Sequence, residues 1–401
     1  MNIRVAHIMN SDIGLRVHAH NYFSYLRDQG YDIHIVSSPG EFVKGDTVTE
    51  EGFVVKTIPF PSRYTPVHDF KAFLQLVRYF RQQRYDIVHT HMVKPGLLGR
   101  IAARLAGTPI VVHTVHGFHY WDDMSHLENR LFIWIERLAT RFCDLLLSQN
   151  HEDIEFAVRE HICPPDKIRF LGNGIDITRF RPDAVSAAAA AAKRHELGVA
   201  PDEKLVGMIG RMVRLKGYLD YLQAARLLCE RGERIKFLAI GATQDSATAL
   251  SPQELITQYE LQGRLQFLGM RQDIPELMAA MDVLVLASYA EGIPRVLVEA
   301  AAMGKPTVGT NVRGTREVIV DGETGYLAPP RNPAALADAI SRLLADPARA
   351  REMGRAARQR AESHFDERFY FWRTDREYRR LIEDKLSAAH LRKLKQIPQE
   401  A

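Results

Sequence analysis

Residues 282–300 read DVLVLASYAEGIPRVLVEA: a short apolar run, a turn of mainly small residues, then an amphipathic helical stretch. An apolar run of this length, closed by turn residues, is typical of a buried strand in a parallel sheet. Pro294 suits the first turn of a helix, because its missing N–H would have no partner there. The segment therefore predicts one strand-turn-helix unit whose turn lies at the carboxyl edge of a sheet.

The same alternation extends along most of the chain. Strands are expected at IRVAHIM, DIHIVSS, FVVKTIP, DIVHTH, IVVHTVHG and DLLLSQ, and again, after a break, at KLVGMIGRM, IKFLAIG, RLQFLG, KPTVGT and TGYLAPP. Strands that alternate with helices predict right-handed crossovers and parallel sheets. We therefore expect an α/β protein with two doubly wound, Rossmann-like domains that face each other across a cleft. The expected parts are residues 1–174, a linker with a helix at 175–203, residues 204–365, and a helical segment at 366–401 that crosses back to the first domain.

Composition excludes several classes of protein. The chain of 401 residues suits two domains, and 46% apolar with 25% charged residues is typical of a globular protein. A net charge of +4 is too small for a dedicated nucleic-acid binder, and the three cysteines lack the spacing of a zinc site or a disulfide framework. No signal-peptide pattern is present, and no apolar run approaches the roughly 18 residues that span a bilayer. We expect a cytoplasmic protein, at most peripheral to the inner face of the cell membrane.

The turn in the opening segment precedes a helix start, where unpaired N–H groups and the helix dipole attract anions. Amides around Gly292 to Val296 are expected to bind phosphate oxygens. Glu291 lies before the helix, and Glu299 follows about a turn and a half into it. Two carboxylates on either side of an anion site suit a sugar, a diphosphate and a nucleoside in line. For the residues taken alone, a surface ion pair between Glu299 and Arg295 is the simpler explanation.

A second turn, GRMVRLKG at 210–217, follows another predicted strand. Its Arg211 and Lys216 can hold a diphosphate and neutralise it as it departs. Two solvated cations in a loop would explain the same pattern. The neighbouring sequence motifs distinguish the diphosphate site from the pair of solvated cations.

In this order, GRMVRLKG, LGMRQDIPELMAAMDVLVLASYAEGIPRVLVEAAAMGKP and VIVDGETGYLAP resemble the donor-binding domain of the retaining GT-B glycosyltransferases with the E-x7-E signature. The resemblance covers most of the chain. TVHGF in the first half is similar to the family 4-like branch that builds bacterial capsules and lipid-linked oligosaccharides.

The resemblance implies a role for each matching residue of the second half. Arg211 and Lys216, in the turn that begins at Gly210, would hold the donor diphosphate; Glu291 would contact donor-sugar hydroxyls, and Glu299 the ribose. The donor site would also include Gly292, Ile293, Arg295 and Val296, which supply amides, and Arg271, in the loop that meets the nucleobase. Many relatives have glycine where this chain has Pro294, which removes one amide donor. For Arg271, an ordinary surface arginine is the alternative.

In the first half, VVHTVHGFHY places His113, His116 and His119 on a segment that passes from the end of a strand into a loop. They need not converge and no carboxylate accompanies them, so we expect no metal site. The resemblance implies that His116 lies beside the donor sugar, with a packed or solvated histidine as the alternative. Gly14 and Arg16 take the place of the family's glycine-rich loop and are weaker candidates for substrate contact, because simple helix-start residues would look the same.

The stretch 70–86 combines basic and apolar residues at helical spacing. Such a helix could lie on an anionic membrane surface. A helix that covers the sheet with its basic side in water is the interpretation that we favour at this point, and peripheral membrane contact remains open.

The predicted reaction is transfer of a hexose or acetamidohexose from a nucleotide sugar to a glycan or polyprenyl-linked acceptor in surface polysaccharide assembly. The resemblance implies that the donor is UDP-linked. Retention by two inversions would need a nucleophilic carboxylate, which no residue identifies. The resemblance implies instead a front-face route in which the departing phosphate oxygen accepts the acceptor's proton. No cofactor and no metal are expected, since cations and helix amides supply the positive charge.

Two alternatives stay open. One is a GT-B epimerase acting on a UDP-acetamidosugar, although the first half shows no clear pair of catalytic acids. The other is a non-catalytic sensor of sugar nucleotides. The joint presence of Arg211, Lys216, Glu291 and Glu299 argues against the sensor.

Overall fold

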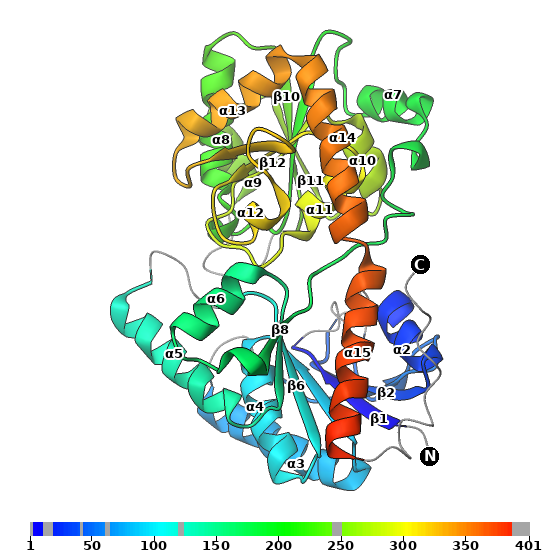
Figure 1. Ribbon diagram of the computed structural model, residues 1–401. Coiled ribbons are helices and arrows are strands. Elements are labelled where there is room, and N and C mark those ends of the chain that lie inside the picture. The colour runs from blue at the N-terminus through cyan, green and yellow to red at the C-terminus, as the bar shows by residue number, and fades with distance from the viewer. Residues whose placement is uncertain are drawn as a thin grey trace. The chain divides into compact units, whose positions relative to one another are not determined.

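The computed structural model describes residues 3–10, 19–40, 43–60, 65–118, 124–242 and 251–386, without the side chains of 19 and 20. The chain forms two compact units (Figure 1). Unit 1 comprises Met1–Leu171 and Tyr370–Ala401, and unit 2 is the continuous segment Gly172–Phe369. Residues 175–203, expected as a linker with a helix, lie within unit 2.

Unit 1 is built on an eight-stranded sheet with the strand order β3-β4-β2-β1-β5-β6-β7-β8. Neighbouring strands are parallel except β3, which runs antiparallel to β4. The described elements of this unit are β1 (Ile3–Ile8), η1 (Ala19–Phe23), α2 (Ser24–Asp28), β2 (Tyr31–Ser37), β3 (Thr47–Val48), β4 (Val54–Thr57), α3 (Pro66–Gln83), β5 (Ile87–His91), α4 (Val93–Leu105), β6 (Ile110–Val115), α5 (His126–Thr140), β7 (Leu145–Ser148), α6 (His151–Arg159), η2 (Pro165–Lys167), β8 (Ile168–Phe170) and most of α15 (Glu367–Lys385).

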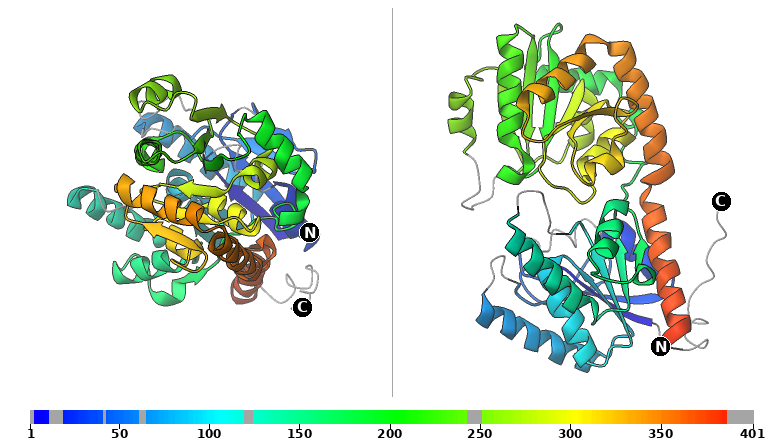
Figure 2. Two further views of the ribbon diagram at one scale, coloured as in Figure 1. Left: turned by 90° about the horizontal axis from the view of Figure 1, so that it is seen from above. Right: turned by 60° about the vertical axis from the view of Figure 1, so that its left-hand side comes forward.

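Helices cover both faces of this sheet. One apolar cluster joins α3, α4, α5 and α6 to one face, and another joins α2 and α15 to the opposite face. Figure 2 shows α15 lying along the sheet of unit 1. Its Tyr378, Leu381 and Ile382 pack with residues such as Tyr31, because an apolar helix face needs a partner surface to be buried.

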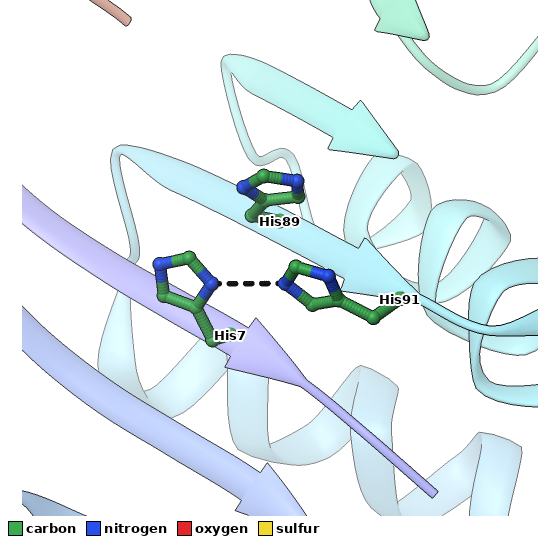
Figure 3. A group of neighbouring side chains, drawn as sticks. All are labelled: His7, His89 and His91. Carbon is green, nitrogen blue, oxygen red and sulfur yellow. Dashed lines mark hydrogen bonds between the residues drawn. The ribbon is translucent and has the colours of Figure 1, made fainter. Parts of the chain in front are cut away.

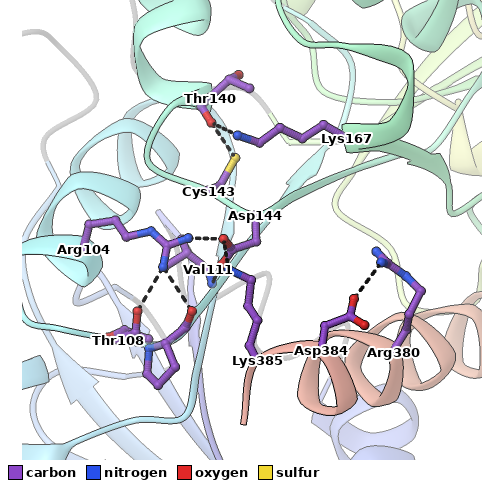
Figure 4. Close-up of polar contacts among 11 residues, drawn as sticks. Arg104, Thr108, Val111, Thr140, Cys143, Asp144, Lys167, Arg380, Asp384 and Lys385 are labelled. Atoms are coloured by element: carbon purple, nitrogen blue, oxygen red, sulfur yellow. Dashed lines mark hydrogen bonds and ion pairs between the residues drawn. The ribbon is translucent and has the colours of Figure 1, made fainter.

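A polar network fixes the end of α15. Asp144, just before β7, accepts hydrogen bonds from Arg104 of α4, from the Val111 amide at 2.7 Å and from Lys385 at 2.8 Å (Figure 4). Lys385 thus forms an ion pair within unit 1.

Unit 2 has a six-stranded, fully parallel sheet with the order β11-β10-β9-β12-β13-β14. Its described elements are η3 (Pro182–Ala184), α7 (Ala187–Glu196), β9 (Lys204–Ile209), η4 (Arg214–Lys216), α8 (Tyr218–Glu230), β10 (Ile235–Ile240), α9 (Pro252–Gln258), β11 (Leu265–Gly269), α10 (Ile274–Ala280), β12 (Val283–Leu286), α11 (Arg295–Ala302), β13 (Thr307–Thr310), α12 (Thr315–Val318), β14 (Gly325–Ala328), α13 (Pro333–Ala345) and α14 (Pro347–His364).

Each sheet has a switch point, where successive strands stop being added on one side of the first strand and begin to be added on the other. In unit 2, the chain proceeds from β9 through β10 to β11 and returns to β12 on the other side of β9. In unit 1, the corresponding neighbours are β1 and β5. Open parallel sheets bind ligands at the carboxyl ends of the strands at such a switch point. The prediction of doubly wound α/β domains is confirmed, and each sheet has one edge where a site is expected.

Among the described residues, no helix combines the length and the apolar character that a membrane-spanning segment needs.

Candidate active site

The two loops at the switch point of unit 2 are fastened to each other. The Tyr289 amide, after β12, donates to the Leu215 carbonyl, after β9, at 2.9 Å. Gly217, just before α8, has a φ of +70°, and a Cβ atom there would lie 1.8 Å from the Ala287 carbonyl oxygen. Only glycine allows this approach. The turns that hold Lys216 and Glu291 therefore have a fixed relative position.

Lys216 and Glu291 form an ion pair at 2.5 Å between Nζ and Oε1. The hydroxyl of Ser288 donates to the same Oε1 at 2.5 Å, and Thr310 in turn donates to the Ser288 carbonyl. The second oxygen of Glu291 has no hydrogen-bond partner among the described residues. This side chain is 10% exposed, so one carboxylate oxygen is anchored while the other can accept a hydrogen bond from a ligand.

Glu299 has a similar arrangement on α11. Arg295 Nε lies 3.0 Å from Glu299 Oε1, as the simpler explanation predicted, and the same arginine donates to the Gly174 carbonyl. Within the described chain, the other oxygen of Glu299 has no partner. Burial raises the pKa of Glu299, although the Arg295 and Arg179 charges oppose this effect. The ion pair thus engages one oxygen of the Glu299 carboxylate and leaves the other oxygen available to a ligand.

The helix start between the two glutamates differs by one residue from the prediction. Pro294 is extended, with ψ of 100°, and lies just before the first helical residue, Arg295. Its carbonyl accepts hydrogen bonds from the Leu297 and Val298 amides. The amides of Arg295 and Val296 have no acceptor in the described residues and form the anion-attracting start of α11. Gly292 and the buried Ile293 precede it.

The remaining predicted residues of unit 2 occupy the same carboxyl edge of the sheet. Gly210 directly follows β9, and its carbonyl accepts a hydrogen bond from Tyr218 at 2.8 Å. Arg211 is exposed, and no ion pair engages it in the described part of the chain. It is therefore available to an anion near Lys216.

Arg271 lies just beyond β11 and is engaged by acids. Its guanidinium forms two hydrogen bonds with Asp273, at 2.7 and 2.6 Å, and contacts Glu196 of α7 at 3.4 Å. Lys193 joins the same network. The position fits the loop that was predicted to meet a nucleobase, but the side chain is already held within unit 2.

In unit 1, the carboxyl ends of β1, β5 and β6 bring several histidines together. His116 Nε2 lies 3.1 Å from His91 Nδ1, and His91 Nε2 lies 3.1 Å from His7 Nδ1. Burial lowers the pKa of His116 to about 4, so its imidazole is neutral at physiological pH. His113 lies apart from this chain and contacts Thr90 at 2.8 Å.

His7, His89 and His91 hold ligand atoms within 4.8 Å of one another (Figure 3). A metal ion would need the lone pairs of three rings to converge. However, the rings of His89 and His91 are stacked with centroids 4.4 Å apart. Both His89 nitrogens are already engaged, by Tyr378 at 2.5 Å and Thr114 at 2.7 Å. Binding a metal would break one of these contacts, so the geometry favours a chain of hydrogen-bonded side chains.

Gly14, Arg16 and His119 lie outside the described residues. Sequence reasoning gave no role to Ser288 or Gly314. Ser288 anchors Glu291, and Gly314 packs against the Gly292 carbonyl. The serine three residues before Glu291, at the end of a strand, was a usable signal, whereas the contact of Gly314 is visible only in three dimensions.

Comparison with family models divides the chain into two regions. Residues 14–179 match the model described as Glycosyltransferase Family 4, and residues 190–360 match Glycosyl transferases group 1. The first region falls mainly in unit 1, and the second lies within unit 2.

Two curated relatives are similar over most of their length. The Escherichia coli UDP-Gal:alpha-D-GlcNAc-diphosphoundecaprenol alpha-1,3-galactosyltransferase is 31% identical, over 81% of this chain and 84% of the relative. The Staphylococcus aureus capsular polysaccharide biosynthesis glycosyltransferase CapM is 27% identical, over 85% and 88%.

Solved structures share the fold. Anabaena Alr3699/HepE, in complex with UDP and glucose, is 21% identical with a TM-score of 0.77, over 94% of this chain and 99% of that one. Sucrose-phosphate synthase from Thermosynechococcus elongatus is 22% identical with a TM-score of 0.81, over 95% and 100%. The predicted GT-B fold is confirmed.

Proposed function

Because the chain belongs to the glycosyl transferases of group 1, preceded by a family 4 glycosyltransferase domain, we propose that it transfers a hexose or acetamidohexose from a UDP-sugar with retention at the anomeric carbon. One observation carries this proposal. Glu291 and Glu299 lie on either side of a helix start, and each has one oxygen fixed within the protein and one available. This arrangement suits a ligand with hydroxyl groups at both ends of a diphosphate.

In the proposed complex, the diphosphate binds the amides at the start of α11 together with Lys216 and Arg211. Glu291 accepts hydrogen bonds from hydroxyls of the transferred sugar. Glu299 accepts from the ribose, with Arg295 holding its other oxygen. The Lys216–Glu291 pair keeps the lysine at the junction between sugar and phosphate, where charge changes during transfer.

The reaction then needs no nucleophile from the protein. The bond between the anomeric carbon and the phosphate oxygen breaks, and the acceptor oxygen forms its new bond on the same face. The acceptor's proton moves to the departing phosphate oxygen, which leaves as part of UDP. Lys216, Arg211 and the α11 amides stabilise the developing negative charge more strongly than that of the bound donor.

We further propose that no divalent cation takes part, because these groups already supply positive charge to the diphosphate. Turnover should be unchanged after treatment with a chelator. A loss that manganese or magnesium restores would overturn this part.

For the acceptor, we propose a polyprenyl-diphosphate sugar or growing glycan in surface polysaccharide assembly, at the cytoplasmic face of the membrane. The support is the E. coli relative, whose name states a UDP-galactose donor and a diphosphoundecaprenol-linked acceptor. The CapM relative is similarly named for capsule biosynthesis.

The test measures UDP release from a panel of UDP-sugars, with and without polyprenyl-diphosphate acceptors, and the anomeric configuration of the product by proton NMR. Glu299→Gln should raise KM for the donor, and Glu291→Gln should lower kcat/KM by about 100- to 1,000-fold. Glu230→Gln is a matched control, because Glu230 also pairs with an arginine at i, i+4, at 2.8 Å, but on the exposed side of α8. Inverted product would overturn retention. UDP binding without transfer to any acceptor would favour a sensor.

A further inference from the structure

An exposed apolar surface lies on two helices of unit 1. Leu127, Leu131 and Trp134 follow one stripe of α5, at spacings of four and three residues that bring them to the same side. On α3, Val67, Phe70 and Leu74 do the same. These six side chains are between 50% and 78% exposed, and they make up six of the thirteen large exposed apolar side chains in the described residues. The two stripes lie on the same face of the sheet with α4 between them, and exposed apolar residues gathered in this way indicate an interaction site.

The buried sides of both helices are already used. Ala72, Leu76 and Phe80 of α3 pack in the core beneath, as do Phe132 and Ile133 of α5. The interpretation of 70–86 as a sheet-covering helix therefore describes one side of α3 only. Its exposed apolar residues do not belong to that core.

The exposed charges around this surface are mostly positive. Lys71, Arg78, Arg130 and Arg141 are exposed, with no ion-pair partner within the described residues.

Two of the three acids on these helices are paired with cations. Asp69 pairs with Lys94 at 2.9 Å, and Glu136 is buried against Arg100. Glu128, which completes the capping box with Ser125, is the one exposed acid of the two helices and remains negative. The exposed apolar stripes are therefore accompanied by an excess of unpaired cations over exposed acids.

The position of the stripes follows from the topology. α3 follows β4 and α5 follows β6, and both strands run parallel to β5. Each helix consequently begins at the carboxyl edge of the sheet. The six apolar residues, three on each helix, lie within the first nine positions of their helix. His116, directly after β6, is at the same edge. α3, α4 and α5 lie together on one face of the sheet (Figure 1).

We infer that the exposed stripes of α3 and α5 form a docking surface for an anionic lipid bilayer. The six apolar side chains enter the boundary between headgroups and acyl chains, while the lysine and arginine side chains extend to lipid phosphates. The cation excess selects an anionic bilayer over another protein surface as the occupant. The docking surface itself does not depend on the proposed function. Its purpose does rest on that function, because docking would bring the sheet edge that holds His116 to an acceptor anchored in the membrane.

The first test is sedimentation with vesicles of equal parts phosphatidylglycerol and phosphatidylcholine, compared with phosphatidylcholine alone. The full chain should bind only the anionic vesicles. The variant Leu127→Gln, Leu131→Gln, Trp134→Gln should bind at least about tenfold more weakly. Each of Arg130→Gln and Arg141→Gln should weaken binding about fivefold. Met270→Gln is the control, since this exposed apolar residue lies in unit 2 and should have no effect.

The second test uses Trp134 as a reporter. The chain has three tryptophans, so Trp121→Phe with Trp372→Phe leaves Trp134 alone. Its fluorescence should shift to shorter wavelength with anionic vesicles and be quenched by brominated acyl chains. Binding without quenching would mean that another surface meets the lipid and would overturn the inference.

Two further outcomes complete the test. Self-association in analytical ultracentrifugation that the Leu127, Leu131 and Trp134 variant abolishes would assign the surface to a second copy of the chain and overturn the bilayer. Turnover of a short-chain, water-soluble acceptor should be unchanged in this variant. Vesicle binding with no turnover on any acceptor would count against the proposed function while leaving the docking surface supported.

Discussion

Gly314 packs against Gly292 so closely that a Cβ atom on Gly314 would lie 1.8 Å from the Gly292 carbonyl oxygen. The same Cβ would lie 3.0 Å from the Glu291 carbonyl oxygen. The loop before α12 thus packs directly against the turn that holds Glu291 and supports it. Substitution of this glycine can move the site without touching any group that meets the substrate.

We predict that Gly314→Ala lowers both the free energy of unfolding and kcat/KM, because the turn at Glu291 must shift to admit the methyl group. Gly322→Ala is the matched control: Gly322 has the same φ of +76°, but a Cβ there meets nothing within 4 Å. In the control, the free energy of unfolding should fall only by the cost of placing alanine in the left-handed conformation, about 1–2 kcal/mol. Chemical denaturation and donor kinetics measure the two effects. Equal losses of activity in both variants would contradict the proposed support of the turn.

The Lys216–Glu291 ion pair should act as a unit. Lys216→Met and Glu291→Gln should each reduce kcat/KM by about 100-fold or more, and the double variant should lose much less than the product of the two. The reason is that each single change already leaves the other side chain without the partner that orients it. A double-mutant cycle of UDP-sugar turnover measures this coupling. Strictly multiplicative effects would show that the two residues act independently.

Donor affinity should depend on the protonation of Glu299. Burial raises the pKa of this carboxyl, so it gains a proton at a higher pH than an exposed glutamate does. The affinity contributed by the carboxylate should be complete above the raised pKa and be lost as the pH falls through it. Calorimetric titration with a UDP-sugar between about pH 4 and 7 should show this loss, and Glu299→Gln should flatten the curve. An unchanged pH dependence in the variant would rule out Glu299 as its source.

Removal of the Tyr378 hydroxyl should destabilise unit 1. The hydroxyl contacts His89 at 2.5 Å and His7 at 3.4 Å, and burial holds the pKa of His89 well below its ordinary value. Tyr378→Phe would leave a buried imidazole nitrogen without its partner, at a cost of about 1–3 kcal/mol. Tyr25→Phe, which removes a hydroxyl with no hydrogen-bond partner in the described chain, should cost less. Urea unfolding of the two variants compares them directly.

The fold could be predicted because it follows from local patterns. The run at 282–286 and the turn after it identify a buried strand and a helix start without reference to any distant residue, and repetition of this pattern implies parallel sheets. Pro294 was misplaced by one residue because proline is compatible with both the first helical position and the residue before it.

The candidate site was predictable only in part, because its contacts join distant segments. Lys216 and Glu291 are 75 positions apart, and nothing in their spacing shows that β9 and β12 are neighbours. Their proximity was inferred from resemblance. The network of Arg271 with α7 had no such signal, and neither did the contact of His7 with His91, which depends on the register of β1 against β5.

The division of unit 1 into two segments has a consequence for synthesis of the protein. Unit 2 is continuous, so its chain is complete before residues 370–386 leave the ribosome, while one face of the sheet of unit 1 still lacks Tyr378, Leu381 and Ile382. Until α15 arrives, that apolar face is open in the nascent chain and is a target for chaperones or premature association. The first unit to be translated is therefore the last to be finished.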